Sequence, residues 1–215
     1  MNTESFYSRF SQYDLVRKQL FCKLINPHRH PDKWEDTPFR RWMDLRLCCY
    51  YDMAEDGLPD TAVTIRNACL SIWNTGAERV LADAWHNTAD RHRVLFCPLG
   101  RVLNELEENL SGTRPLSLLE DSPLYILSNT ARIFGAVYMA VPDIRRQIGK
   151  LLKENYYILP SSIHECLILP DTGMIGAEEL NSLVRLVNRD HVAEDEILAD
   201  HVYYYECAQD AVRSC

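Results

Sequence analysis

The chain has 215 residues, 47% of them hydrophobic and 25% charged, so its composition is that of a globular protein and excludes collagen-like and disordered chains. The formal net charge of -8 argues against a surface that grips nucleic-acid phosphates. No apolar run reaches the roughly 18 residues that a membrane span requires. We therefore expect a cytoplasmic protein without direct nucleic-acid binding and without membrane attachment.

Apolar residues recur at helical spacing through the N-terminal half. The first stripe extends from Phe6 to Leu24, and the second extends from Phe39 to Ala54. Similar patterns follow over residues 76–87 and 98–110. The sequence therefore predicts a mostly helical lobe over residues 1–110.

Residues 111–123 lose this periodicity and are rich in turn-forming residues, which predicts a connector. Short β-rich runs then alternate with helical patterns over residues 124–215. The predicted elements are strands at 124–127 and 133–140, a helix at 142–152, strands at 156–159 and 165–169, helices at 176–188 and 194–198, and a strand at 202–205. The order β-β-α-β-β-α-β indicates an α+β fold, with a mixed or antiparallel sheet and its helices on one face. The two lobes could also form one continuous domain.

Eight cysteines lie inside apolar patterns rather than in a loop framework, and no C-x-x-C motif is present. We expect reduced thiols. The sequence also lacks both common glycine-rich phosphate-binding motifs, so no cofactor is expected.

The segment YYILPSSIHECLILPD offers the strongest candidate for catalysis, because Ser161, His164 and Glu165 occur together between two apolar strands. A hydrolase or a metal-dependent enzyme could use these three residues. Neighbouring residues of a strand point to opposite faces, however, and no nucleophile turn of the G-x-S-x-G type is present. We favour the interpretation that the three side chains stabilise the turn and that no residue is catalytic.

Two Asp-His pairs near the C-terminus could contribute to a divalent-ion site, with Asp200 and His201 as the ligands. The alternative is that these side chains anchor the terminal strand. We favour the second interpretation and expect no metal.

Tyrosines and carboxylates near the C-terminus could bind a protein partner. Tyr203 and Tyr205 would supply contact area, and Glu194, Asp195 and Glu196 would attract a basic surface. Alternation along the strand places part of the tyrosine set in the core. The same tyrosine-rich strand could alternatively form the edge of a homodimer.

Most of the chain resembles a domain-of-unknown-function family abundant in gut anaerobic bacteria. The motifs that carry the resemblance are ILPSSIHE at Ile158–Glu165 and DHVYYY at Asp200–Tyr205. Longer members of that family carry an additional N-terminal segment. The resemblance implies a bacterial, cytoplasmic α+β protein and supplies no activity.

The charge and the lack of a complete catalytic motif together predict a non-catalytic, acidic protein-interaction module. Its partner would be a protein with a basic surface. One concrete version is an inhibitor, encoded on a phage or another mobile element, of a host defence effector that handles nucleic acids, similar to an anti-CRISPR protein.

Overall fold

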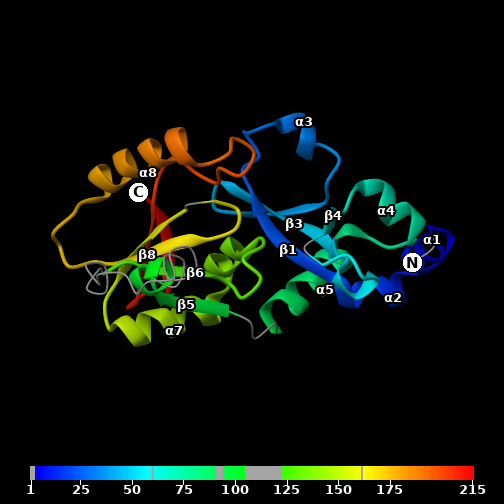
Figure 1. Ribbon diagram of the computed structural model, residues 1–215, viewed down its shortest axis with the longest axis horizontal. Coiled ribbons are helices and arrows are strands. Elements are labelled where there is room, and N and C mark those ends of the chain that lie inside the picture. Colours follow the sequence, from blue (N-terminus) through cyan, green and yellow to red (C-terminus); the bar gives the residue numbers. More distant parts are fainter. Residues whose placement is uncertain (1–2, 60, 91–93, 105–122, 161) are drawn as a thin grey trace. The chain divides into compact units, whose positions relative to one another are not determined.

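The computed structural model describes residues 3–59, 61–90, 94–104, 123–160 and 162–215 (Figure 1). The chain forms two compact units, Met1–His92 and Arg93–Cys215. Both contain helices and antiparallel sheet, so the protein is of the mixed α+β class.

The first unit is a four-stranded antiparallel sheet with several helices. Its elements are α1 (Thr3–Phe10), α2 (Tyr13–Val16), η1 (Arg17–Gln19), β1 (Leu20–Ile25), α3 (Pro31–Trp34), β2 (Phe39–Trp42), β3 (Leu45–Asp52), η2 (Ala54–Asp56), β4 (Ala62–Thr64), α4 (Asn67–Ile72) and α5 (Ala77–Asp90). The central strand β3 pairs with β1, β2 and β4. Helix α5 contacts β1 and β3 and buries Val80, Leu81 and Ala84.

The mostly helical character predicted for this part of the chain is wrong in two places. The end of the first predicted helix is strand β1, and the predicted helix at Phe39–Ala54 is a hairpin of β2 and β3 that turns at Met43 (φ 52°). All six residues of β1 are buried, as are six of the eight residues of β3. A strand that is buried on both faces has a continuous run of apolar residues in its sequence. Such a run also contains apolar residues at helical spacing, which is why a helix was predicted.

The second unit is a six-stranded antiparallel sheet in the order β10-β9-β7-β8-β6-β5. Its elements are β5 (Val94–Pro98), helical residues 99–104, β6 (Tyr125–Asn129), η3 (Gly135–Ala140), α7 (Pro142–Leu152), β7 (Tyr156–Leu159), β8 (Cys166–Pro170), α8 (Ala177–His191), β9 (Tyr203–Glu206) and β10 (Ala211–Ser214). The unit begins before the predicted connector because β5 pairs with β6, from Val94 opposite Asn129 to Pro98 opposite Tyr125. The predicted boundary at residue 110 is therefore misplaced, and residues 111–122 of the connector lie outside the described residues.

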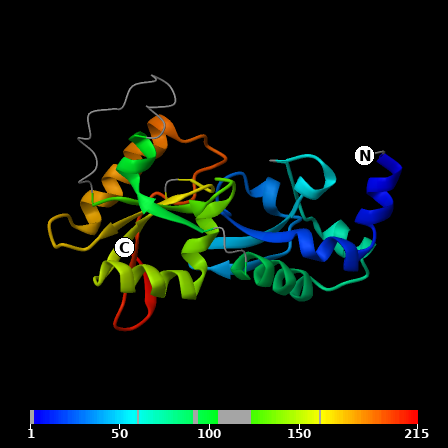
Figure 2. The same ribbon diagram turned by 60° about the horizontal axis from the view of Figure 1, so that its bottom comes forward.

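The two long helices of this unit lie on opposite faces of the sheet, which corrects the predicted single helical face (Figure 2). On one face, the Tyr156 hydroxyl donates a hydrogen bond to the Arg145 carbonyl of α7 at 3.1 Å. On the other face, Leu159 packs with Leu180 and Val184 of α8. Tyr156 and Leu159 are three residues apart in β7, so alternation directs them to opposite sides.

Several predicted elements of the second unit are present: the strand at β6, the hairpin of β7 and β8, helices α7 and α8, and strand β9. The predicted strand at 133–140 is instead the 3₁₀ helix η3, whose six residues are all buried. Residues 194–196 form a turn and not a helix. Strand β10, which the sequence did not predict, pairs with β9 on the side opposite β7. Among the described residues, no helix combines the length and the apolarity needed to cross a membrane.

Candidate functional site: an apolar pocket and the His164 cluster

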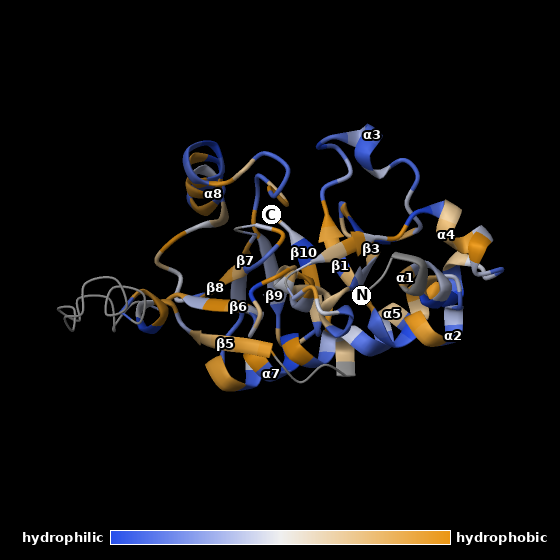
Figure 3. Ribbon diagram, turned by 45° about the vertical axis from the view of Figure 1, so that its right-hand side comes forward, coloured by the Kyte–Doolittle hydropathy of each residue, from blue (hydrophilic) through white to orange (hydrophobic). Residues whose placement is uncertain are grey.

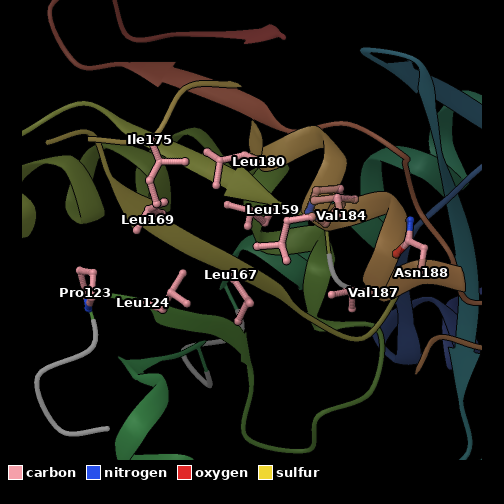
Figure 4. Close-up of a pocket in the computed structure, with 12 residues that line it drawn as sticks. Pro123, Leu124, Leu159, Leu167, Leu169, Ile175, Leu180, Val184, Val187 and Asn188 are labelled. Atoms are coloured by element: carbon pink, nitrogen blue, oxygen red, sulfur yellow. The ribbon is translucent and has the colours of Figure 1, made fainter. Parts of the chain in front are cut away.

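An apolar pocket of about 310 Å³ lies between α8 and the β7–β8 hairpin in the second unit (Figure 4). Its lining residues are Pro123, Leu124, Leu159, Pro160, Leu167, Leu169, Ile175, Leu180, Leu183, Val184, Val187 and Asn188. The sheet supplies one wall, because Leu159 and Leu167 are directly opposite each other in the ladder and lie on the same face as Leu169. This volume falls at the lower end of the range for small-molecule sites.

Helix α8 supplies the other wall through its inner side. Leu180, Val184 and Asn188 recur every four residues and are all at least 95% buried. Leu183 and Val187 flank this stripe and also line the pocket. The exposed side of the helix is mostly polar, apart from Leu186, and α8 is coloured with both hydrophobic and hydrophilic residues in Figure 3. The helix is thus amphipathic, with its apolar stripe over the sheet.

Among the described residues that line the pocket, Asn188 is the polar one. Its Nδ2 donates hydrogen bonds to the Ala199 carbonyl and to Asp200 Oδ1, both at 2.9 Å. Its Oδ1 is buried and has no hydrogen-bond partner among the described residues. Because both partners of Nδ2 are acceptors, the orientation of the amide is fixed and Oδ1 is left as an unsatisfied acceptor.

The pocket opens to solvent at an apolar rim. Ile175, which precedes α8, is 40% exposed, and Leu183 is 48% exposed, although both line the pocket. Met174 (85%) and Leu186 (46%) are further exposed apolar side chains near and on α8, and neither lines the pocket. Large apolar side chains grouped at a surface are typical of binding sites.

The second candidate is a cluster around His164, in the turn between β7 and β8. The ring stacks on Phe134 with a centroid distance of 5.5 Å. His164 Nδ1 accepts a hydrogen bond from the Phe134 backbone N–H at 3.2 Å, and Nε2 lies 3.3 Å from Glu196 Oε1. An accepting Nδ1 places the proton of a neutral ring on Nε2, from which it can be donated to Glu196.

The backbone of His164 makes hydrogen bonds as well as its ring. Its N–H donates to Ser162 Oγ at 3.0 Å, and its carbonyl accepts a hydrogen bond from Ser128 Oγ at 2.8 Å. The adjacent Ile163 N–H donates to the Glu196 carbonyl at 2.9 Å. The cluster therefore joins the β7–β8 turn to β6 and to the 194–196 turn, as a structural brace does.

Of the three residues predicted as the alternative catalytic set, the structure describes His164 and Glu165, and no hydrogen bond joins their side chains. Ser161 lies outside the described residues. Both ring nitrogens of His164 have internal partners, whereas the Glu165 side chain makes no hydrogen bond or ion pair to any other residue that the structure describes. This arrangement is consistent with the favoured interpretation, in which the segment stabilises its turn.

The alternative metal ligands, Asp200 and His201, also lack a converging set. Asp200 Oδ1 accepts from Asn188, and the His201 ring packs edge-on against Tyr203 at 5.0 Å. Over the described ranges, no group of three or more His, Cys, Asp or Glu side chains could hold a metal ion. Within the described part of the chain, no third ligand therefore joins these two residues.

The predicted partner-binding tyrosines are in the core. Tyr203 and Tyr205 are 0% and 1% exposed, and the edge position predicted for their strand is taken by β10. Burial removes both rings from any partner surface, which corrects the expectation. Among the predicted carboxylates, Glu194 and Asp195 are exposed, whereas Glu196 contacts His164.

The sequence interpretation missed the pocket because its walls come from segments far apart in the chain. One signal could have pointed to Asn188. The predicted helix at 176–188 has an apolar stripe, and an asparagine that continues the spacing of Leu180 and Val184 is a polar residue on an apolar face.

The chain matches the model of a family of unknown function (DUF5688) over residues 1–207, and it belongs to that family. This confirms the resemblance at the level of an uncharacterised domain family. No match was found among curated proteins or among solved structures.

Proposed function

We propose that this protein is a non-catalytic binding module whose binding site is the apolar pocket beneath α8. The observation that carries the proposal is the pocket itself: apolar walls from a helix and a sheet, one buried polar group, and an opening with an apolar rim. Small-molecule sites have this composition, in which apolar walls supply affinity and a few polar groups select the ligand.

The geometry around His164 favours binding over catalysis. A general base must have a ring nitrogen within reach of a substrate proton. Here Nδ1 accepts from Phe134 and Nε2 lies against Glu196, so His164 could act as a base only if one of these contacts were broken. Among the described residues that line the pocket there is no Ser, Cys, His, Asp or Glu.

A protein partner is the second candidate ligand. The exposed side chains of Met174 and Leu186 lie beyond the pocket lining and favour this alternative. The net charge of -8 would favour a partner with a basic surface, and exposed Glu194 and Asp195 could contribute to that contact. One specific version of this alternative is an inhibitor of an effector that handles nucleic acids. A cytoplasmic location is a separate prediction.

Two leucines of α8 provide a matched test. Leu183 lines the pocket and Leu186 does not, yet they are 48% and 46% exposed on the same helix. Titration calorimetry with toluene, a small apolar molecule, should give saturable binding to the wild-type protein. Leu183→Glu should weaken it at least about tenfold, because a charge at the pocket mouth is poorly solvated there.

Leu186→Glu is the control, because it makes the same change of charge on the same helix outside the pocket. Toluene should bind this variant within about twofold of the wild-type affinity. The proposal is wrong if toluene fails to bind the wild-type protein, or if both variants weaken binding equally.

A further inference from the structure

A second cavity, of about 330 Å³, lies between α7 and the turn that joins β9 to β10. Figure 2 shows this hairpin beside α7. The helix and the residue that follows it contribute Arg146, Gly149, Lys150 and Lys153 to the lining, and this spacing places them along one side of the helix. Among the described lining residues, none is shared with the α8 pocket, so this cavity is a separate candidate site.

Gly149 allows the hairpin to approach the helix closely. A Cβ at this position would lie 2.7 Å from Cys207 Sγ and 3.3 Å from Tyr205 Cε1, and all three residues line the cavity. Glycine is unfavourable in the interior of a helix, and the close approach is the physical reason for it here. The packing of the hairpin on α7 therefore holds the two walls of the cavity together.

The cationic side chains along this side of α7 are only partly neutralised. Arg146 Nη1 donates a hydrogen bond to Asp210 Oδ2 at 2.6 Å, and its Nη2 donates to Asp143. In contrast, Lys150 and Lys153 make no hydrogen bond or ion pair to any other residue that the structure describes. Like charges one helical turn apart repel each other. Two ammonium groups at the cavity are thus left without an internal counter-charge from the described residues.

The carboxylate of Asp210 is already engaged and does not balance the lysines. Its Oδ1 accepts a hydrogen bond from the Tyr205 hydroxyl at 2.8 Å, and its Oδ2 accepts the one from Arg146. These hydrogen bonds, first from Tyr205 and then from Arg146, lower the pKa of the Asp210 carboxyl and keep it ionised. Asp210 and Arg146 cancel each other in charge, so the two lysines give the described lining its positive charge.

The two lysines supply more positive charge than the end of α7 requires. The carbonyl end of a helix carries about half a negative elementary charge, which a single lysine would offset. The surrounding unit is acidic, because residues 93–215 contain 11 Lys and Arg against 18 Asp and Glu. Positive charge gathered at a cavity in such a unit indicates an anionic ligand.

We propose that the cavity between α7 and the β9–β10 turn binds a small organic phosphate monoester, with the phosphate group held by Lys150 and Lys153. A phosphate monoester carries a charge of about -1.5 to -2 at pH 7, which matches two ammonium groups. A cavity of about 150 Å³ in another protein accommodates benzene, so about 330 Å³ accommodates about a dozen heavy atoms, more than a bare phosphate ion. The organic part of the ligand would fill the remaining space.

Phenyl phosphate and phenyl sulfate test the match of charge without changing the protein, because they have the same shape and the same number of heavy atoms. At pH 7.5 the phosphate is close to a dianion, whereas the sulfate is a monoanion. In titration calorimetry at about 50 mM salt, phenyl phosphate should bind the wild-type protein at one site and about tenfold more tightly than phenyl sulfate. At pH 5 the phosphate loses one charge, and the preference should fall to about twofold or less.

Two substitutions identify the residues that hold the phosphate. Lys150→Met and Lys153→Met should each weaken the binding of phenyl phosphate about fivefold or more, because each removes one charged contact. Lys18→Met is the matched control, since it removes the charge of an exposed lysine that does not line the cavity. Its affinity should stay within about twofold of the wild-type value. All three lysines are exposed, and circular dichroism checks that the variants fold.

Several results would overturn the proposal. Phenyl phosphate could fail to bind the wild-type protein, or phenyl sulfate could bind equally well at pH 7.5. A preference that persists at pH 5 would show that the cavity does not recognise the second negative charge. Equal weakening in all three lysine variants would show general attraction to positive charge instead of a site. The toluene titration of the α8 pocket is independent of each of these outcomes.

Discussion

His164 Nε2 lies 3.3 Å from Glu196 Oε1, and this contact joins the β7–β8 turn to a segment 32 residues further along the chain. The other ring nitrogen accepts the Phe134 N–H from a third segment. One imidazole therefore links three parts of the second unit, close to the point where Pro160 lines the pocket. We interpret this contact as part of the scaffold that shapes the pocket.

Replacing His164 tests the structural role. His164→Ala should lower the free energy of unfolding by about 1–3 kcal/mol, because it removes both ring contacts and leaves the Phe134 N–H without its acceptor. Glu165→Ala is the neighbouring control and should change stability by no more than about 0.5 kcal/mol, since its side chain has no hydrogen bond or ion pair among the described residues. Urea unfolding measures both values. Equal losses of unfolding free energy in His164→Ala and Glu165→Ala would contradict the structural role of His164.

Gly135 allows η3 to approach β6 and the His164 turn. A Cβ at this position would lie 2.3 Å from Ser128 Oγ, 2.6 Å from the Asn129 backbone nitrogen and 2.8 Å from the His164 carbonyl oxygen. Two of these atoms belong to the backbone and cannot move aside independently. Gly135→Ala should therefore destabilise the protein by about 2–3 kcal/mol or more.

The matched substitution is Gly176→Ala, because a Cβ there would meet no atom within 4 Å. We expect thermal unfolding to show a clearly lower midpoint temperature for Gly135→Ala. The free energy of unfolding of Gly176→Ala should differ from the wild-type value by less than about 1 kcal/mol. A well-folded Gly135→Ala protein with wild-type stability would show that the close approach is absent.

Lys23 makes a pH-dependent contribution to the stability of the first unit. Burial lowers the pKa of its ammonium from the ordinary 10.5 to about 8, although Nζ donates to Thr64 Oγ1 and lies 5.4 Å from the centre of the Trp34 ring. Between these two pKa values the unfolded chain binds more protons than the folded one. The free energy of unfolding should therefore rise with pH across that interval.

At pH 7 the ammonium is charged in both states, so the folded protein bears the cost of burying it. Lys23→Met should be more stable than wild type at pH 7 by about 1–3 kcal/mol, and this difference should shrink towards pH 10. Burial raises the pKa of the Cys48 thiol to about 11, so this group lowers the free energy of unfolding as the pH rises above its ordinary pKa. Cys48 is present in both the wild-type protein and Lys23→Met.

A second variant is Lys33→Met, which removes an exposed ammonium whose charge also lowers the pKa of Lys23. Its free energy of unfolding should rise less steeply with pH than that of the wild type, because the pKa of Lys23 moves back towards its ordinary value. If urea unfolding shows parallel curves for wild type and Lys23→Met from pH 7 to 10, the lowered pKa is wrong.

The elements that the sequence predicted correctly have local signals. Helix α7 begins at Pro142, a residue suited to a first turn, and the β7–β8 hairpin has two apolar runs separated by turn formers. The β2–β3 hairpin was missed because its turn at Met43 contains no glycine, although φ is 52° there. Positive φ at a residue other than Gly leaves little trace in the sequence.

The site is less predictable than the fold because it depends on tertiary contacts. Leu167 and Leu183 are ordinary apolar residues of a strand and a helix, and nothing in their local sequence brings them to one pocket. The prominent pair of His164 and Glu165 suggested a catalytic alternative, but the carboxylate that His164 meets is Glu196. Proximity in sequence was a poor guide to proximity in space.

The most direct test of the binding pocket is methyl NMR of the wild-type protein titrated with toluene. We predict saturable shifts of the methyl signals of Leu159, Leu167 and Val184, with no shift for Leu151, which is 69% exposed on α7 and lies outside the pocket. Unchanged signals from the three pocket residues at millimolar toluene, or shifts that affect Leu151 as strongly, would contradict the account.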